Sequence, residues 1–115
     1  MAEHPTVKWS GSSGKQYTYY VRELPVHFSA DQNGNYIYSK LNQSNEWVPI
    51  YIGQGDMKEE MENNHNATCI KNNGATHVHV HKKVNADARL NEEQDLLASY
   101  TNAYAPTGCN EREGG

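Results

Sequence analysis

The chain has 115 residues, and its ten lysines and arginines against fourteen aspartates and glutamates give it a formal net charge of −4. This length suits one small domain. The acidic balance excludes the broad positive field that drives non-specific nucleic-acid binding, and the sequence has no apolar run near the roughly 20 residues that span a bilayer.

The beginning of the chain bears on the cellular compartment. Residues 1–9 lack a basic patch followed by an apolar stretch, so we expect no secretory signal, no membrane partner and a cytoplasmic location. Because thiols stay reduced in the cytoplasm, we expect Cys69 and Cys109 to be free.

The sequence divides into a terminal segment, one domain and a tail. Residues 1–15 contain the joint Ser-Gly-Ser-Ser-Gly and are expected to form a flexible N-terminal segment. Residues 16–112 are expected to form the single domain, and residues 113–115 a disordered tail. Eight tyrosines and two tryptophans can supply the core that the scarce aliphatic residues do not.

Three strands are predicted in the first half of the domain. Residues 17–21 are rich in β-favouring side chains, and a strong turn signal follows at residues 31–34. Residues 36–38 and 47–52 then predict a hairpin.

The second half predicts helix, strand and helix. Asp56 and Glu59 have the spacing of a capping box, so a helix is expected to follow. Residues 76–81 alternate strictly between histidine and smaller residues, as a strand does, and residues 87–103 predict the last helix. The resulting class is α+β.

Glu93 stands between Leu90 and Leu97 on the predicted apolar face of the last helix. A carboxylate there is costly unless it is paired or holds a metal. Arg89, four residues earlier, could pair with it in a structural salt bridge, and this interpretation stays open beside a catalytic one.

Two tyrosines and a glycine-rich turn are further candidates. Tyr36 and Tyr51 lie on the two strands of the predicted hairpin, where their hydroxyl groups could converge, although core packing is the commoner role of such tyrosines. The turn at residues 53–56 could present backbone N–H groups to a phosphate, but Asp56 would repel it.

Together these residues resemble the GIY-YIG endonuclease domain family. Residues 34–36 stand where the family has Gly-Ile-Tyr, and residues 51–53 match its Tyr-Ile-Gly signature. Residues 93–97, followed by Pro106 and Asn110, look like the family's metal-binding helix and closing segment. The resemblance implies a three-stranded antiparallel sheet flanked by helices, with the strand at 17–21 as an additional N-terminal edge strand.

The resemblance also implies metal-dependent hydrolysis of phosphodiester bonds in DNA. Glu93 would hold one Mg²⁺ or Mn²⁺, a demand that a single carboxylate can meet because Mg²⁺ keeps several waters. Tyr36 and Tyr51 would position or deprotonate the attacking water. Gly53 and Asn110 would support the substrate and the site.

The chain departs from the family at one position. The family's arginine on the helix after Tyr-Ile-Gly falls on Glu60 or Met61, so a weakened or inactive enzyme is expected. Lys58 is the only base in that helix, and His65 matches a basic or histidine position a turn later. Arg89 could supply the missing charge. The alternative function is a non-catalytic nucleic-acid-binding or protein-binding module.

Partners and a second metal complete the expectations. So acidic a domain would hold DNA weakly, so a homodimer or larger assembly is expected to help; DNA is favoured over RNA. His77, His79 and His81 would stand about 7 Å apart on one strand face, where His77 and His79 could share a Zn²⁺. The alternative is a solvent-facing polar side opposite buried valines.

Overall fold

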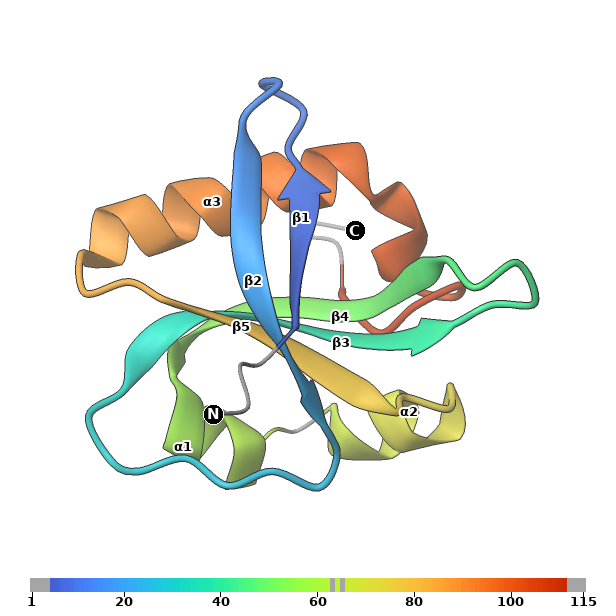
Figure 1. Ribbon diagram of the computed structural model, residues 1–115, viewed down its shortest axis with the longest axis horizontal. Coiled ribbons are helices and arrows are strands. Elements are labelled where there is room, and N and C mark those ends of the chain that lie inside the picture. The colour runs from blue at the N-terminus through green and yellow to red at the C-terminus, as the bar shows by residue number, and fades with distance from the viewer. Residues whose placement is uncertain (1–4, 63, 65, 112–115) are drawn as a thin grey trace.

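The computed structural model describes residues 5–62, 64 and 66–111. Its centre is a curled antiparallel sheet with the strand order β1-β2-β5-β3-β4 (Figure 1). The described strands are β1 (Thr6–Ser10), β2 (Gln16–Glu23), β3 (Asn33–Leu41), β4 (Trp47–Asp56) and β5 (His77–Lys82). The α+β class expected from the sequence is therefore confirmed, although the sheet is larger than the expected three core strands and one edge strand.

The hairpin of β3 and β4 brings the two candidate tyrosines to neighbouring positions. Tyr36 stands opposite Gly53 in the strand register, and Tyr38 stands opposite Tyr51. The register then shifts at Ser39, where the ladder is irregular. Alternation along these strands therefore places the rings of Tyr36, Tyr38 and Tyr51 on one face.

The N-terminal segment differs from the prediction. Residues 6–10, expected to be flexible, form β1 and pair with β2, which buries Trp9 to 4% exposure. The turn between the two strands is fixed by Ser13, whose N–H and hydroxyl donate to Asp95 at 2.8 and 2.7 Å. Because β1 pairs with it, β2 lies between β1 and β5 and is not the edge strand that the sequence predicted.

Helices cover both faces of the sheet, as Figure 1 shows. The long helix α3 (Ala86–Ser99) and the short 3-10 turn η1 (Thr101–Ala103) lie on one side, and α1 (Met57–Glu62) and α2 (Ala67–Asn72) lie on the other. The predicted cap of α1 is confirmed in part, because the Asp56 carboxylate accepts a hydrogen bond from Glu59 N at 3.1 Å. None of the described helices is long and apolar enough to cross a bilayer.

Each face has its own core. The side covered by α1 and α2 contains the buried residues Tyr36, Tyr38, Ile50, Met57, Ile70, Val78, Val80 and Cys109. The side covered by α3 contains Trp9, Tyr19, Ile37, Ile52, Leu96 and Ala103. Aromatic side chains thus make up much of the buried core, as the composition predicts.

The buried face of α3 is not the one predicted. Glu92 and Leu96 are buried, at 4% and 0% exposure, whereas Leu90 is 42% exposed. Glu93 is half-buried beside that face. The face predicted to be buried, through Leu90 and Leu97, is therefore about one residue away from the face that is buried in the structure. The reason is that a polar residue, Glu92, faces the sheet.

Candidate active site

The centre of the candidate site is the pair formed by Tyr36 on β3 and Tyr51 on β4. Their rings stack with centroids 6.1 Å apart and an interplanar angle of 26°. Tyr51 contributes to the raised pKa of Tyr36, and Asn66, which precedes α2, acts to lower the pKa of Tyr51. Gly53 leaves the room that Tyr36 needs, since an added Cβ there would lie 2.4 Å from Tyr36 Oη.

Both phenols hold their protons more tightly than tyrosine does in water. Burial, followed by the neighbouring Tyr51 and the charge of Glu60, raises the pKa of Tyr36. Burial is also the main cause that raises the pKa of Tyr51, against the hydrogen bonds from Asn66 and Tyr36. At neutral pH the pair therefore offers neutral hydroxyl groups, which can donate and accept hydrogen bonds but do not carry charge.

Glu93 reaches this pair electrostatically. Its negative charge contributes to the raised pKa of Tyr36 and of Tyr51. Because α3 covers the opposite face of the sheet from the tyrosine rings, Glu93 acts on them from the other side of the sheet. Its effect is that of a charge at a distance, since burial is the main cause of both raised pKa values.

Glu60 is the second carboxylate at the pair. A Cβ on Gly55 would lie 2.9 Å from Glu60 Oε1, so this side chain folds back over the end of β4. Its charge contributes to the raised pKa of Tyr36, Tyr38 and Tyr51. Where the resembled family has arginine, α1 therefore presents negative charge to the tyrosines.

The neighbouring Met61 has an apolar role. Its sulfur accepts a hydrogen bond from the hydroxyl group of Tyr38. Burial, followed by the charge of Glu60, raises the pKa of Tyr38 to about 12. Met61 therefore helps to close the core beneath the site and carries no charge toward it.

The two other cations named from the sequence are engaged away from the pair. Arg89 donates from one terminal nitrogen to the carbonyl groups of Lys83 and Val84 at 2.9 and 2.7 Å, and from Nε to Gln54 Oε1 at 3.0 Å. It thereby ties the loop before α3 to β4. Lys58 Nζ lies 3.2 Å from the Glu62 carboxylate one turn along α1. His65 lies outside the described residues.

Asn110 holds the backbone between the second tyrosine and the glycine. Its Oδ1 accepts from Ile52 N and its Nδ2 donates to Ile52 O, both at 2.8 Å. The side chain is buried, so it positions the backbone between Tyr51 and Gly53. Its expected role in substrate binding stays a prediction.

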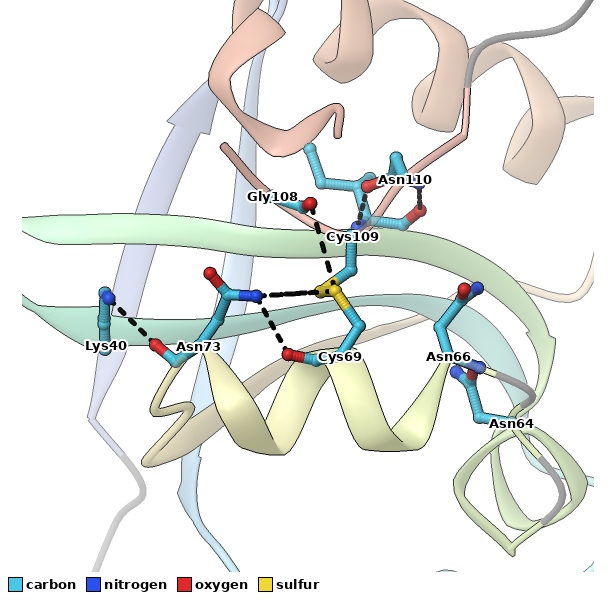
Figure 2. Close-up of a disulfide and its surroundings, with 9 residues drawn as sticks. Lys40, Asn64, Asn66, Cys69, Asn73, Gly108, Cys109 and Asn110 are labelled. Atoms are coloured by element: carbon cyan, nitrogen blue, oxygen red, sulfur yellow. Dashed lines mark hydrogen bonds between the residues drawn. A yellow bond between two sulfur atoms is a disulfide. The ribbon is translucent and has the colours of Figure 1, made fainter. Parts of the chain in front are cut away.

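A disulfide fixes the segment that carries Asn110. Cys69 on α2 and Cys109 are covalently joined, so the expectation of two free thiols is wrong (Figure 2). Asn73 Nδ2 lies 3.4 Å from each sulfur, and Cys109 N donates to Ile50 O at 2.8 Å. Figure 2 shows the bond linking α2 to the C-terminal segment beside β4.

The sequence analysis missed Glu92, the most buried carboxylate among the described residues of α3. It accepts a hydrogen bond from the Tyr19 hydroxyl at 2.5 Å and lies 3.0 Å from His81 Nδ1. Strand alternation places Tyr19 and His81 on the face that meets α3. These two polar side chains, facing the helix, are the sequence feature that could have indicated a buried carboxylate at Glu92.

The three histidines of β5 have separate partners. His79 is fully buried, and its Nδ1 accepts from Trp9 Nε1 at 3.0 Å. His77 Nδ1 lies 2.8 Å from Thr76 Oγ1, and His81 belongs to the Glu92 cluster. The expectation of a solvent-facing polar side is wrong, because Trp9 and Trp47 cover it. Within the described segments no three His, Cys, Asp or Glu side chains form a metal-binding group.

Comparisons of the chain with protein-family models, curated proteins and solved structures find no match. A functional assignment must therefore come from the residues and their geometry. The tyrosine pair, the charge of Glu93 and the backbone clamp of Asn110 are the features that such an assignment can use.

Proposed function

We propose that the chain is a GIY-YIG-type nuclease domain that hydrolyses phosphodiester bonds in nucleic acid, with DNA favoured over RNA, and that Glu93 holds a Mg²⁺ or Mn²⁺ ion. The observation that carries the proposal is the stacked pair of Tyr36 and Tyr51, on which the charge of Glu93 acts. The charge of Glu93, which lies 57 positions after Tyr36 (93 minus 36), acts on both tyrosines of the resembled signature.

The donor set fits such an ion. Mg²⁺ binds through one or two carboxylates and keeps several waters, so Glu93 suffices as the protein ligand when the phosphate completes the shell. The negative charges of Glu93 and Glu60 at the tyrosine pair favour a dication there. When bound, the ion would polarise a phosphate oxygen.

The tyrosines have the role of positioning water. Their raised pKa keeps the phenols neutral, so they act as hydrogen-bond donors and acceptors and not as phenolate bases. The stacking of Tyr36 against Tyr51 fixes the orientation of both rings, and Asn110 keeps the strand beneath them in register. A well-placed water gains rate from orientation alone.

Glu60 makes the proposed enzyme slow. Phosphoryl transfer needs positive charge where the transition state gathers negative charge, and Glu60, one of the two positions (Glu60 or Met61) on which the family's arginine falls, opposes it. This observation favours the second candidate function, a nucleic-acid-binding or protein-binding module on a nuclease fold.

A plasmid assay separates the two functions. We expect the wild type to convert supercoiled plasmid to the open circle with Mg²⁺ or Mn²⁺ and to stop on addition of EDTA. Tyr36→Phe and Tyr51→Phe keep the rings but remove the hydroxyls, and each should slow cleavage at least about 10-fold. Tyr100→Phe is the matched control, since that hydroxyl accepts from Ser10 N far along the chain. A wild type that leaves the plasmid intact with both metals would leave only the binding module.

Assembly and compartment belong to the same proposal. A homodimer or a larger assembly would add the phosphate contacts that an acidic monomer lacks. The disulfide between Cys69 and Cys109 favours an oxidising compartment over the cytoplasm expected from the sequence, since thiols are kept reduced in the cytosol.

A further inference from the structure

A pocket of about 360 Å³ lies on the face of the sheet that carries the tyrosine pair, but over the neighbouring strands. It is separate from the candidate active site, and nothing in the proposed reaction uses it. Its rim consists of Tyr20, Arg22, Phe28, Gln32, His81 and Lys82.

The rim has a positive charge in an acidic protein. Arg22 and Lys82 are the two cations, and the residues that line the pocket include no carboxylate, although the chain carries a net charge of −4. Within the described segments neither cation forms an ion pair. Both charges are therefore available to an anionic ligand such as a phosphate group.

The same rim has aromatic faces. Tyr20 is 52% exposed, more than any other aromatic residue in the described part of the chain. The Arg22 guanidinium lies 5.8 Å from the centroid of the Phe28 ring, so this cation is held over an aromatic surface. Cations interleaved with aromatic rings are the combination that binds unpaired nucleotides, whose bases stack while their phosphates meet the charges.

The pocket and the tyrosine pair rest on one shared core. Val80, which lines the pocket, stands opposite Tyr36 in the strand register, and Met57 belongs to the same core cluster as Tyr36. The pocket therefore opens on the face of the sheet whose core holds the tyrosine pair.

We infer that this pocket binds an unpaired nucleotide of a nucleic-acid strand, with its phosphate on Arg22 and Lys82 and its base against Tyr20 or Phe28. The inference rests on the proposed function only in taking nucleic acid as the substrate. It deepens that function by assigning single-stranded or locally unpaired segments as the substrate class.

The test is the anisotropy of a fluorescent, short oligodeoxythymidylate, measured in EDTA so that no cleavage occurs, with oligouridylate as the ribose arm. The wild type should bind, and the double variant Arg22→Gln/Lys82→Gln should bind at least about 10-fold more weakly, with the salt slope of the affinity reduced by about 1.4. Tyr20→Ala, at an exposed position, should weaken binding roughly 5- to 100-fold. The matched control is Lys15→Gln/Lys71→Gln, which removes the same charge from exposed sites elsewhere.

The outcomes separate this inference from the proposed nuclease. If the wild type binds no oligonucleotide, or if the pocket variants bind as tightly as the charge-matched control, the inference is overturned even when plasmid is cleaved. If the pocket variants lose binding while the wild type cleaves no plasmid, the inference stands and the nuclease function fails. Circular dichroism of each variant confirms that a loss of binding is not a loss of folding, and Tyr20→Ala repeats the test without touching the Arg22–Phe28 contact.

Discussion

The phenol of Tyr36 lies against the α-carbon of Gly53, so that a Cβ built on this glycine would be 2.4 Å from Tyr36 Oη and 2.5 Å from Cζ of the ring. Both atoms belong to the Tyr36 side chain, which is 1% exposed and has no room to move aside. The glycine of the Tyr-Ile-Gly signature is therefore required by the packing of the first tyrosine.

The substitution Gly53→Ala should destabilise the fold by about 1–3 kcal/mol, because the added methyl overpacks a buried contact. Urea unfolding measures the loss. In a Tyr36→Leu background the same substitution should cost much less, since the ring it meets is gone. An equal cost in both backgrounds would show that the contact does not explain the glycine.

The sequence predicted local features better than long-range ones. The hairpin that carries Tyr36 and Tyr51 follows from alternation and a turn, and both are readable within a short window. Strand β1 was missed because its partner and the anchor of its turn, Asp95, are distant in the sequence. The disulfide joins positions 40 residues apart, a pairing that no local pattern indicates.

The candidate site was predictable where a motif named it and not where tertiary packing decided. Glu93, Tyr36 and Tyr51 stand out from the helix and strand patterns, and the family resemblance then gives them a shared role. The effect of the Glu93 charge on the two tyrosines becomes visible only in the fold. Glu92 was overlooked because a helix periodicity places apolar residues inward, whereas hydrogen-bond donors from two strands turn this carboxylate toward the sheet.

The buried histidine of β5 predicts a loss of stability in mild acid. Burial, and then the charge of His77, lower the pKa of His79 from 6.5 to about 4. Between these two pH values the His79 side chain is protonated in the unfolded chain but neutral in the folded protein. The free energy of unfolding is therefore undiminished above pH 6.5 and falls by up to about 3 kcal/mol as the pH drops to 4.

Urea unfolding across this pH range checks the sign. His79→Asn keeps an acceptor at the place of Nδ1 for Trp9 but cannot titrate, so the variant should lose stability less steeply than the wild type. His27→Asn, at an exposed position, is the control and should follow the wild type. Parallel pH curves for the wild type and His79→Asn would contradict this account.

Reduction of the disulfide should lower the free energy of unfolding by about 4 kcal/mol. The bond closes a loop of 40 residues, and its reduction returns the corresponding conformational entropy to the unfolded chain. Thermal unfolding with and without dithiothreitol measures the change. In the Cys69→Ala/Cys109→Ala variant the reductant should have no effect. Two titratable thiols in the unreduced, denatured wild type would show that the bond is not formed.

Replacement of Glu60 by arginine should raise the rate of plasmid cleavage by roughly 10- to 1,000-fold, because it restores positive charge where the transition state of phosphoryl transfer is negative. Glu59→Arg makes the same charge change at the neighbouring exposed position and should raise the rate far less. Equal acceleration by the two variants would assign the gain to general attraction of DNA.

The central claim is tested most directly by Glu93→Gln, which keeps the size of the side chain and removes its charge. The variant should lose Mn²⁺ binding, seen by electron paramagnetic resonance, and at least about 100-fold of the plasmid cleavage rate. Asp87→Asn, on an exposed turn of the same helix, should change neither quantity. Undiminished metal binding and cleavage by Glu93→Gln would contradict the account.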